Sequence, residues 1–492
     1  MIKQTTIAIL AAGLLAGAGS LHAQLGNAAL ARQKVEEGQR FYHRNDMGNA
    51  ITAYDACIER FQGDPDPEAK YWVLKAFLHK TESLLVLKKH GEAVAAADRA
   101  IRHYQNDARL AFTALMNLST LKVYALASLG KLDEAVAVFD TCIARCEEEA
   151  SQENRDYALM KAAEKTRLLE KLGRHQEIVA GCDALLARYA NADPAFHRDG
   201  FYALMFAKGA ALEKLNRRDE AARAWDALVT RYDKSKPNGP CIKEFPAQAL
   251  VSKGSLLLKA GRTGEASRAF DTCLARFKEE TCPHARIYIA QAFNQKALLL
   301  CEVGQLDEAV ALSRECVRRY QDEREPETLE EMVKAHVFQA ELLLKMQKPR
   351  EAISVCEKGV ERFATDEYPR LLCQSFTLAL IKCTALMRMG KWEEAAAAAD
   401  FYLSHDKRVS DSSCVNSKSS RAYYYKGVAL EHLGRIGEAR AAYQNAIAFY
   451  KLCDEPELLE VVDEINLRIK RLDEKDAKSE PEAAAEEKNF KW

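Results

Sequence analysis

The chain has 492 residues, of which 48% are apolar, and 71 Lys and Arg stand against 72 Asp and Glu, giving a formal net charge of −1. This composition is typical of a folded chain and excludes a disordered or polytopic membrane protein. Balanced charge also argues against nucleic-acid binding, which needs clustered positive charge. Glycine and proline number only 23 and 12, and this scarcity of turn residues favours helices over sheets.

Residues 1–23 are predicted to be a secretory signal peptide. Lys3 precedes an apolar run over 7–18, and small residues lead to Ala23, which is the order of charge, apolar core and cleavage site that such signals share. The run is shorter than the ~20 residues of a membrane-spanning helix. We expect cleavage after Ala23 and a mature protein in the periplasm or outside a bacterial-type cell. An uncleaved anchor is the alternative.

Residues 24–455 form one sequence unit repeated ten times. The string Gly-x-x-x-Glu-Ala recurs, and its last position serves as an anchor for each unit. Successive anchors follow at intervals of 42 to 45 residues, a regularity that indicates repeat architecture and excludes three unrelated domains. The anchors are Ala50, Ala93, Ala135, Ile178, Ala221, Ala266, Ala309, Ala352, Ala395 and Ala439.

Each unit is predicted to be a hairpin of two helices. Apolar residues follow the anchor at the spacing of one helix face. The residue nine before the anchor is Phe41 in the first unit and leucine in the rest, and the residue twelve before is small in nine units. Small residues there let the two helices approach closely. Gly or Asn marks the turn in most units, and acidic residues open the second helix, where the helix dipole favours them.

These positions resemble the tetratricopeptide repeat. The clearest copies have their anchors at Ala266, with Gly254, Leu257, Phe270 and Cys273 at matching spacings, and at Ala439. The period of about 43 exceeds the usual 34, and the closing proline is absent, which fits a first helix lengthened by about two turns. The resemblance implies an all-α, right-handed solenoid of ten helix hairpins that acts as an interaction scaffold.

The segment after the last unit is predicted to cap the solenoid. Pro456 can open a helix, and an apolar stripe then runs over 456–475, as the open end of a solenoid requires. Residues 476–492 are acidic and of simple composition, so we expect them to be disordered. Phe490 and Trp492 within this tail suggest a short docking motif, and an untethered tail is the alternative. The stripe consists of Leu458, Val462, Ile465, Ile469 and Leu472.

Charged residues form repeated columns. Lysine stands thirteen residues before the anchor in eight units, and an acidic residue stands five residues after it in eight units. These two columns predict a ladder of ion pairs within or between hairpins. A charged groove for a ligand is the alternative. Arginine stands ten after the anchor in seven units, in the last turn of the second helix, where a cation suits the dipole. The lysines are Lys80, Lys122, Lys165, Lys208, Lys253, Lys296, Lys382 and Lys426.

The sequence contains no motif for a catalytic nucleophile, a phosphate loop or a metal site, so we predict no catalytic residue, no metal and no cofactor. The 14 cysteines are mostly assigned to the repeat as small apolar residues of a packed interface, as at the position shared by Cys57, Cys142, Cys273 and Cys316. Any disulfide is expected among the residues that look loop-borne, which are Cys241, Cys282, Cys414 and Cys453.

In the family that this chain resembles, partners bind along the concave face of the first helices. In the last two units this face becomes apolar and aromatic, a composition favoured at interaction hot spots. Core packing between units is the alternative. The residues predicted to bind a partner are Phe376, Leu380, Arg421, Tyr424 and Tyr425.

The sequence therefore predicts a non-enzymatic scaffold that binds proteins or peptides in the bacterial cell envelope, with no membrane span after cleavage. An envelope enzyme or carbohydrate-binding protein that uses the aromatic end stays open, as does a homodimer.

Overall fold

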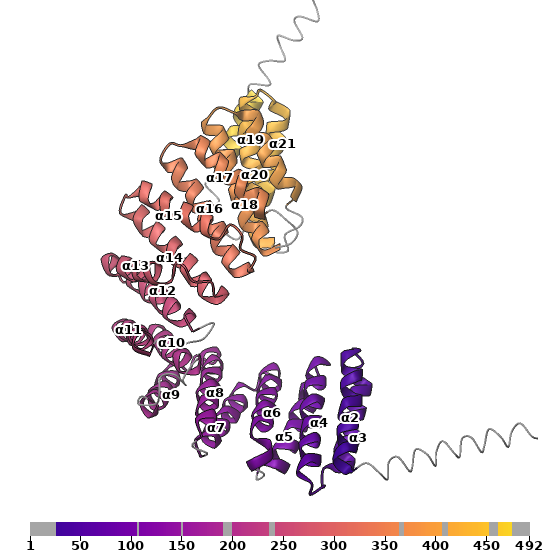
Figure 1. The fold of residues 1–492 in the computed structure, drawn as a ribbon. Helices are drawn as coiled ribbons and strands as arrows, with labels where there is room; N and C mark the ends of the chain where they lie inside the picture. The colour runs from indigo at the N-terminus through magenta and orange to yellow at the C-terminus, as the bar shows by residue number, and fades with distance from the viewer. Residues whose placement is uncertain are drawn as a thin grey trace, which may run out of the picture. The chain divides into compact units, whose positions relative to one another are not determined.

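A computed structural model describes residues 26–105, 108–148, 151–189, 199–235, 242–363, 369–405, 412–451 and 461–474. These ranges consist of helices and short turns without a strand (Figure 1), which confirms the predicted all-α solenoid. The chain divides into two compact units at Asn238 and Gly239. The predicted signal peptide and the tail over 476–492 lie outside the described residues.

The first unit contains five helix hairpins. First helices pack against their own second helix and against a neighbouring first helix, as α4 does against α5 and α6. This nearest-neighbour packing is the pattern of a solenoid. The hairpins are α2 (Asn27–His43) with α3 (Met47–Phe61), α4 (Pro67–Val86) with α5 (His90–Tyr104), α6 (Ala108–Ser128) with α7 (Leu132–Glu148), α8 (Gln152–Lys171) with α9 (His175–Arg188), and α10 (Asp199–Lys214) with α11 (Arg218–Ser235).

The second unit contains five more hairpins, packed in the same way. Proline opens α14 and α16 at their first turn, where its missing N–H costs nothing. The hairpins are α12 (Glu244–Lys259) with α13 (Thr263–Phe277), α14 (Pro283–Glu302) with α15 (Leu306–Arg319), α16 (Pro326–Lys345) with α17 (Pro349–Phe363), α18 (Pro369–Arg388) with α19 (Trp392–His405), and α20 (Ser412–His432) with α21 (Ile436–Tyr450).

The turn inside every hairpin contains one residue with positive φ, always five positions before the anchor. Glycine supplies this left-handed conformation in six turns and asparagine in two, as the steric preference of the left-handed region predicts. Lys88 (φ 58°) and Gln347 (φ 59°) adopt it with full side chains. The turn geometry is therefore common to all ten hairpins even where the residue is unfavourable.

Small residues on the first helix make room for aromatic rings on the second, as expected. A Cβ built on Gly254 would lie 2.4 Å from Cε1 of Phe270, and one on Gly209 would lie 2.2 Å from Nε1 of Trp225. Both rings are fully buried. The close approach of the two helices in these hairpins thus depends on the missing side chain.

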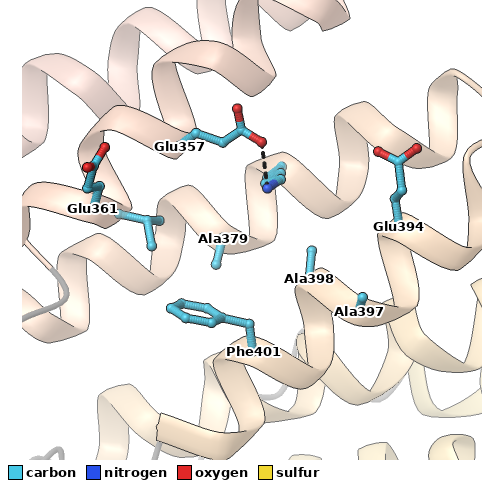
Figure 2. A pocket seen from close by; sticks show the side chains of 9 residues that line it. Glu357, Glu361, Ala379, Glu394, Ala397, Ala398 and Phe401 are labelled. Carbon is cyan, nitrogen blue, oxygen red and sulfur yellow. Dashed lines mark ion pairs between the residues drawn. The ribbon is translucent and has the colours of Figure 1, made fainter.

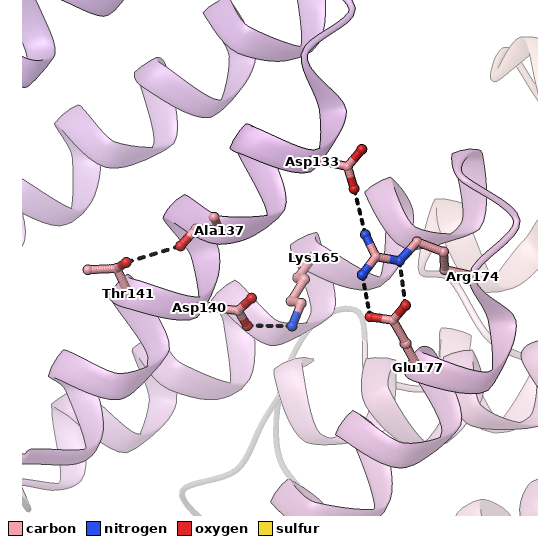
Figure 3. Close-up of polar contacts among 7 residues, drawn as sticks. All are labelled: Asp133, Ala137, Asp140, Thr141, Lys165, Arg174 and Glu177. Atoms are coloured by element: carbon pink, nitrogen blue, oxygen red, sulfur yellow. Dashed lines mark hydrogen bonds and ion pairs between the residues drawn. The ribbon is translucent and has the colours of Figure 1, made fainter.

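The predicted ladder of ion pairs is confirmed, and it runs between hairpins. Each described pair joins an acid on the second helix of one hairpin to a lysine on the first helix of the next, as in Lys382 with Glu357 (Figure 2) and Lys165 with Asp140 (Figure 3). Five of the pairs have N–O distances of 2.5 to 2.8 Å. The described pairs include Lys80–Asp55, Lys122–Asp98, Lys165–Asp140, Lys208–Asp183, Lys296–Asp271, Lys382–Glu357 and Lys426–Asp400.

The arginine column also links neighbouring hairpins. Arg362 Nη2 donates to the carbonyl oxygen of Glu323 at 3.0 Å, and Arg145 and Arg319 donate to the carbonyls of Gln105 and Lys278. The carbonyls of Gln105 and Lys278 directly follow the carboxyl end of the preceding second helix, where backbone acceptors lack intrahelical partners, and that of Glu323 lies in the loop after α15. The column therefore caps the helix of the hairpin before it.

Residues 461–474 are helical and pack against the last hairpin. Ile465 and Leu472 are fully buried among side chains of α20 and α21, and Arg440 on α21 pairs with Asp473 at 2.8 Å. The apolar stripe expected for a capping helix thus covers the end of the second unit. Pro456, expected to open that helix, lies outside the described residues.

Candidate functional site

The structure places two of the five predicted partner-binding residues in the core. Phe376 and Leu380 on α18 are 1% and 5% exposed, and the Phe376 ring packs edge-on against Tyr402 with centroids 4.9 Å apart. This burial favours core packing between hairpins, the alternative that sequence reasoning left open, over partner binding for these two side chains.

Tyr424 contacts the chain's own capping helix. Its hydroxyl donates to Glu464 Oε1 at 3.0 Å, and the guanidinium carbon of Arg468 lies 5.9 Å from its ring centroid. Arg468 also pairs with Glu431, which accepts a hydrogen bond from Tyr443. A polar network thus occupies the aromatic end of the last hairpin.

Tyr425 and Arg421, also on α20, retain some access to solvent. Tyr425 is half-buried against the cluster that contains Phe376, while Arg421 is exposed. Burial lowers the pKa of the nearby Lys418 to about 8, and the positive charge of Arg421 adds to this shift. The two cations make this part of α20 electropositive, so it favours an anionic group over a cationic one.

A better-formed candidate lies on the first helices of the preceding hairpins. We call it the first-helix groove, a cavity of about 430 Å³. It combines amide and charged side chains with an apolar rim, which is the composition of a site that orients a ligand by a few polar groups. Its lining residues are Val251, Ser255, Gln291, Asn294, Gln295, Leu298, Glu331, Lys334 and Phe338, from α12, α14 and α16.

Asn294 on α14 lines this groove. Its Nδ2 donates to the carbonyl oxygen and to Oε2 of Glu331, both at 2.9 Å. Glu331 is 7% exposed and accepts from Lys334 Nζ at 2.7 Å. The Asn294 Oδ1 atom is buried and has no hydrogen-bond partner among the described residues. A buried acceptor without a donor is costly, so this atom favours a ligand that carries an N–H group.

The apolar rim of the groove complements these polar groups. Leu298 is 41% exposed, and Val251 and Phe338 line the same cavity. Sequence reasoning missed the groove because it searched for aromatic residues. The available signal was a run of amides at helix spacing, Gln291, Asn294 and Gln295, followed by an apolar residue on the same helix.

The described cysteines behave as core residues. Cys57, Cys142, Cys273 and Cys316 are buried and form no disulfide, and burial raises the pKa of Cys57 and Cys273 to about 12. Cys282 precedes α14 as its N-cap and is also buried and free.

The prediction that Cys414 is loop-borne is wrong, because α20 already begins at Ser412. Cys241 and Cys453 lie outside the described residues. Within the described ranges, no three His, Cys, Asp or Glu side chains are placed to hold a metal ion. None of the helices described combines the length and apolar character needed to cross a membrane.

The stacked hairpins and the groove on their first helices define the class of helical-repeat scaffolds. Two stretches, 383–451 and 203–235, match models of the tetratricopeptide repeat. The chain therefore contains tetratricopeptide repeats in these two stretches, and such repeats in general support a protein-interaction scaffold.

Several solved structures are similar to this chain at low identity. A tetratricopeptide repeat protein from Parabacteroides merdae is 14% identical with a TM-score of 0.33, over 64% of this chain and 98% of that one. BtubC from P. vanneervenii is 12% identical with a TM-score of 0.38, over 46% and 89%. Yeast Tom70 is 12% identical with a TM-score of 0.35, over 94% and 99%. A search of the curated protein sequences gave no match.

Proposed function

We propose that this protein is a non-enzymatic scaffold that binds an extended peptide segment of a partner protein in the first-helix groove. The observation that carries the proposal is the buried, unpaired Oδ1 atom of Asn294 beside the apolar side chains Leu298 and Phe338. An extended peptide presents backbone N–H groups and side chains in alternation. It can therefore satisfy the amide oxygen and cover the apolar rim together.

Lys334 and Glu331 add polarity to the groove. Lys334 lines the groove, is half exposed and pairs with Glu331 at 2.7 Å. A backbone carbonyl or a carboxylate of the peptide would accept from it. The groove therefore favours a neutral or acidic segment with at least one large apolar side chain.

The test uses peptides selected from a random phage-displayed library against the full chain. Binding measured by calorimetry should weaken about tenfold in Asn294→Leu, because the leucine can neither accept from nor donate to the peptide. Asn117→Leu, an exposed position on α6, is the matched control and should bind as the unmodified chain does. Equal affinities for all three proteins, each with an unchanged melting curve, would contradict the proposal.

The location in the bacterial cell envelope belongs to the same proposal. It is supported by the charge, apolar run and small residues over 1–23. Cell fractionation with amino-terminal sequencing should recover a chain that begins at Gln24 outside the cytoplasm. Recovery of a cytoplasmic chain that begins at Met1 would refute the envelope location. The proposal of peptide binding in the first-helix groove would be unaffected.

The enzyme or carbohydrate-binding alternative depended on unpaired carboxylates beside Tyr424. The carboxylate that faces this ring, Glu464, is hydrogen-bonded to the tyrosine and paired with Arg468 at 3.2 Å. The geometry at Tyr424 therefore favours the scaffold. Self-association is a separate question, which light scattering of the full chain answers.

A further inference from the structure

A second groove lies between the second helices of neighbouring hairpins in the second unit. We call it the outer groove. It has a volume of about 600 Å³, with α17 and α19 as its walls and α18 as its floor (Figure 2). Its lining residues are Glu357, Val360, Glu361, Ala379, Lys382, Glu394, Ala397, Ala398 and Phe401.

The centre of the outer groove is apolar. Ala397 and Ala398 leave space on α19 where longer side chains would close the slot, and Val360 and Ala379 lie opposite. Phe401 is 39% exposed at one end. An aromatic side chain inserted here would gain contact with Phe401 and cover the alanine surface. Burial of one aromatic ring is among the largest single contributions to binding.

The lining of the groove contains three carboxylates, of which one is unpaired among the described residues. Glu357 is neutralised by Lys382 at 2.8 Å, and Glu394 pairs with Lys391 at 2.7 Å through side chains that are about half exposed. Glu361 has no ion pair or hydrogen bond within the described residues and is exposed. Figure 2 shows Glu361 and Glu394 on opposite sides of the slot. A ligand with a cation on each side of an aromatic ring therefore matches the groove.

A groove at the equivalent position in the first unit lacks two features of the outer groove. It lies between α7 and α9, has about 210 Å³, and occupies the same positions of the repeat. Its three carboxylates are all paired, since Asp140, Glu147 and Glu177 meet Lys165, Arg188 and Arg174 (Figure 3 shows the first and last pairs). It also has no aromatic side chain in its lining. The unpaired carboxylate and the exposed ring thus distinguish the outer groove.

We propose that residues 488–492 of this chain, Lys-Asn-Phe-Lys-Trp, dock in the outer groove. The segment carries two cations and two aromatic rings without an acid, whereas residues 476–487 are mostly acidic and alanine. The aromatic side chains match the slot, and Lys488 and Lys491 match Glu361 and Glu394. This docking gives the motif Phe490–Trp492 an intramolecular role. It does not rest on the first-helix groove, which lies on other helices.

The segment can reach the groove. Thirteen residues separate Glu474 from Lys488, which span up to about 45 Å when extended. The helix over 461–474 packs on α20 and α21, and α20 packs on α19, so the groove is about two or three helix spacings of ~10 Å away. A short tether gives an effective concentration in the millimolar range. A weak contact is therefore enough to hold the segment in place.

The experiment cross-links the full chain. A photoreactive p-benzoylphenylalanine replaces Trp492, and the same residue replaces Ala484 in a control chain. After irradiation, peptide mapping should place the position-492 cross-link within the same molecule, on residues 394–401 or 357–361. Glu361→Gln combined with Glu394→Gln should reduce this yield about fivefold, as the loss of two partly exposed ion pairs implies.

The control variant combines Glu308→Gln and Glu351→Gln, which occupy the position of Glu394 in other hairpins, and it should leave the yield unchanged. A cross-link in the first-helix groove, a cross-link only between molecules, or equal yields at positions 492 and 484 would each overturn the proposal. Circular dichroism melts of every variant confirm that the fold is retained. None of these outcomes depends on peptide binding to Asn294.

Discussion

Single residues set the repeat through backbone conformation and through volume. Every hairpin turn needs one residue with positive φ. In several hairpins the size of the residue twelve before the anchor is matched to that of the residue four after it. Glycine stands opposite the rings of Tyr54, Trp225, Phe270 and Tyr443, whereas larger residues stand opposite small ones, as Thr81 does opposite Ala97. The hairpin with Val123 and Phe139 at these positions is an exception, because both of its residues are large.

Replacing Lys88 by glycine should stabilise the protein. Lys88 has φ 58°, a conformation that costs a residue with a Cβ about 1 kcal/mol. Lys88→Gly should therefore raise the midpoint of thermal unfolding measured by circular dichroism. Lys89→Gly is the control, because Lys89 has φ −84° and gains nothing from the added freedom. A lower unfolding midpoint for Lys88→Gly than for the unmodified chain would contradict the claim that the backbone of Lys88 is strained.

Adding a methyl group at Gly254 should destabilise the second unit. The new Cβ would lie 2.4 Å from the Phe270 ring, and such overpacking costs about 1–3 kcal/mol. This exceeds the gain of about 1 kcal/mol in helix propensity that alanine brings. Gly181→Ala on α9, where nothing lies within 4 Å of the added atom, should instead raise the unfolding midpoint. Equal effects at both sites would disprove the volume argument.

At the scale of elements, polar columns hold neighbouring hairpins in register. The ladder pairs the second helix of one hairpin with the first helix of the next. Where the acid is missing from one hairpin, the lysine is missing from the hairpin that follows. The hairpin anchored at Ala309 has Arg314 in place of the acid, and the following hairpin has Gln339 in place of the lysine. Apart from the first hairpin, Gln339 is the single break in the lysine column. Apart from the last hairpin, Arg314 is the single break in the acid column. The two breaks therefore fall at the same step of the ladder.

One rung should contribute a small, measurable coupling. In the pair of Lys165 with Asp140, the side chains are 22% and 56% exposed, so a double-mutant cycle with Lys165→Gln and Asp140→Asn should give about 0.5 kcal/mol. The coupling should shrink in high salt, because exposed charges are screened. Denaturant unfolding of the four chains at two salt concentrations measures it. Strict additivity of the two substitutions would refute the rung.

The start of the second helices should make stability sensitive to acid. Hydrogen bonds from Arg174 and Arg262 lower the pKa of Glu177 and Glu265 three residues later. A lowered folded pKa stabilises the protein above the unfolded value of about 4.3, and this stability is lost as the pH falls through the folded pKa. At pH 6 the unmodified chain should therefore have a higher unfolding midpoint than the double variant Glu177→Gln/Glu265→Gln. This difference in midpoint should disappear as the pH is lowered to about 3. A gap that does not change with pH would contradict the linkage.

At the scale of the whole molecule, stability is local. Packing joins each helix to its neighbours along the chain, and each compact unit has its own buried clusters, such as those around Val73 in the first and Leu343 in the second. Stability in such arrays is approximately a sum over hairpins and their interfaces. The two units are therefore expected to fold without each other.

The second unit should fold when expressed alone. A chain over Gly239–Trp492 retains its hairpins and the helix that caps them, so it should show a helical spectrum and a cooperative thermal transition. A chain that ends at residue 451 is the comparison, and it should melt at a lower temperature because the apolar side chains around Tyr443 lose their cover. An unfolded Gly239–Trp492 chain would contradict the division into units.

Much of the fold could be predicted because the repeat averages over ten copies. The anchor, the turn and the apolar face each recur often enough to outweigh exceptions such as Val123. The predicted site was less successful. Periodicity assigns Phe376, Leu380 and Tyr424 to a helix, but whether a side chain is exposed depends on what the next hairpin or the capping helix brings against it.

The balanced charge and helical composition of this chain were already determined by its sequence, as were the period, the hairpin turns and the residue types of the ladder. These properties are local or repeat along one dimension. Only the tertiary structure decided that the ladder joins neighbouring hairpins, that the aromatic end is covered, and that Asn294 keeps a buried oxygen without a donor. The reason is that burial and pairing depend on distances between helices, and those distances arise when the hairpins stack.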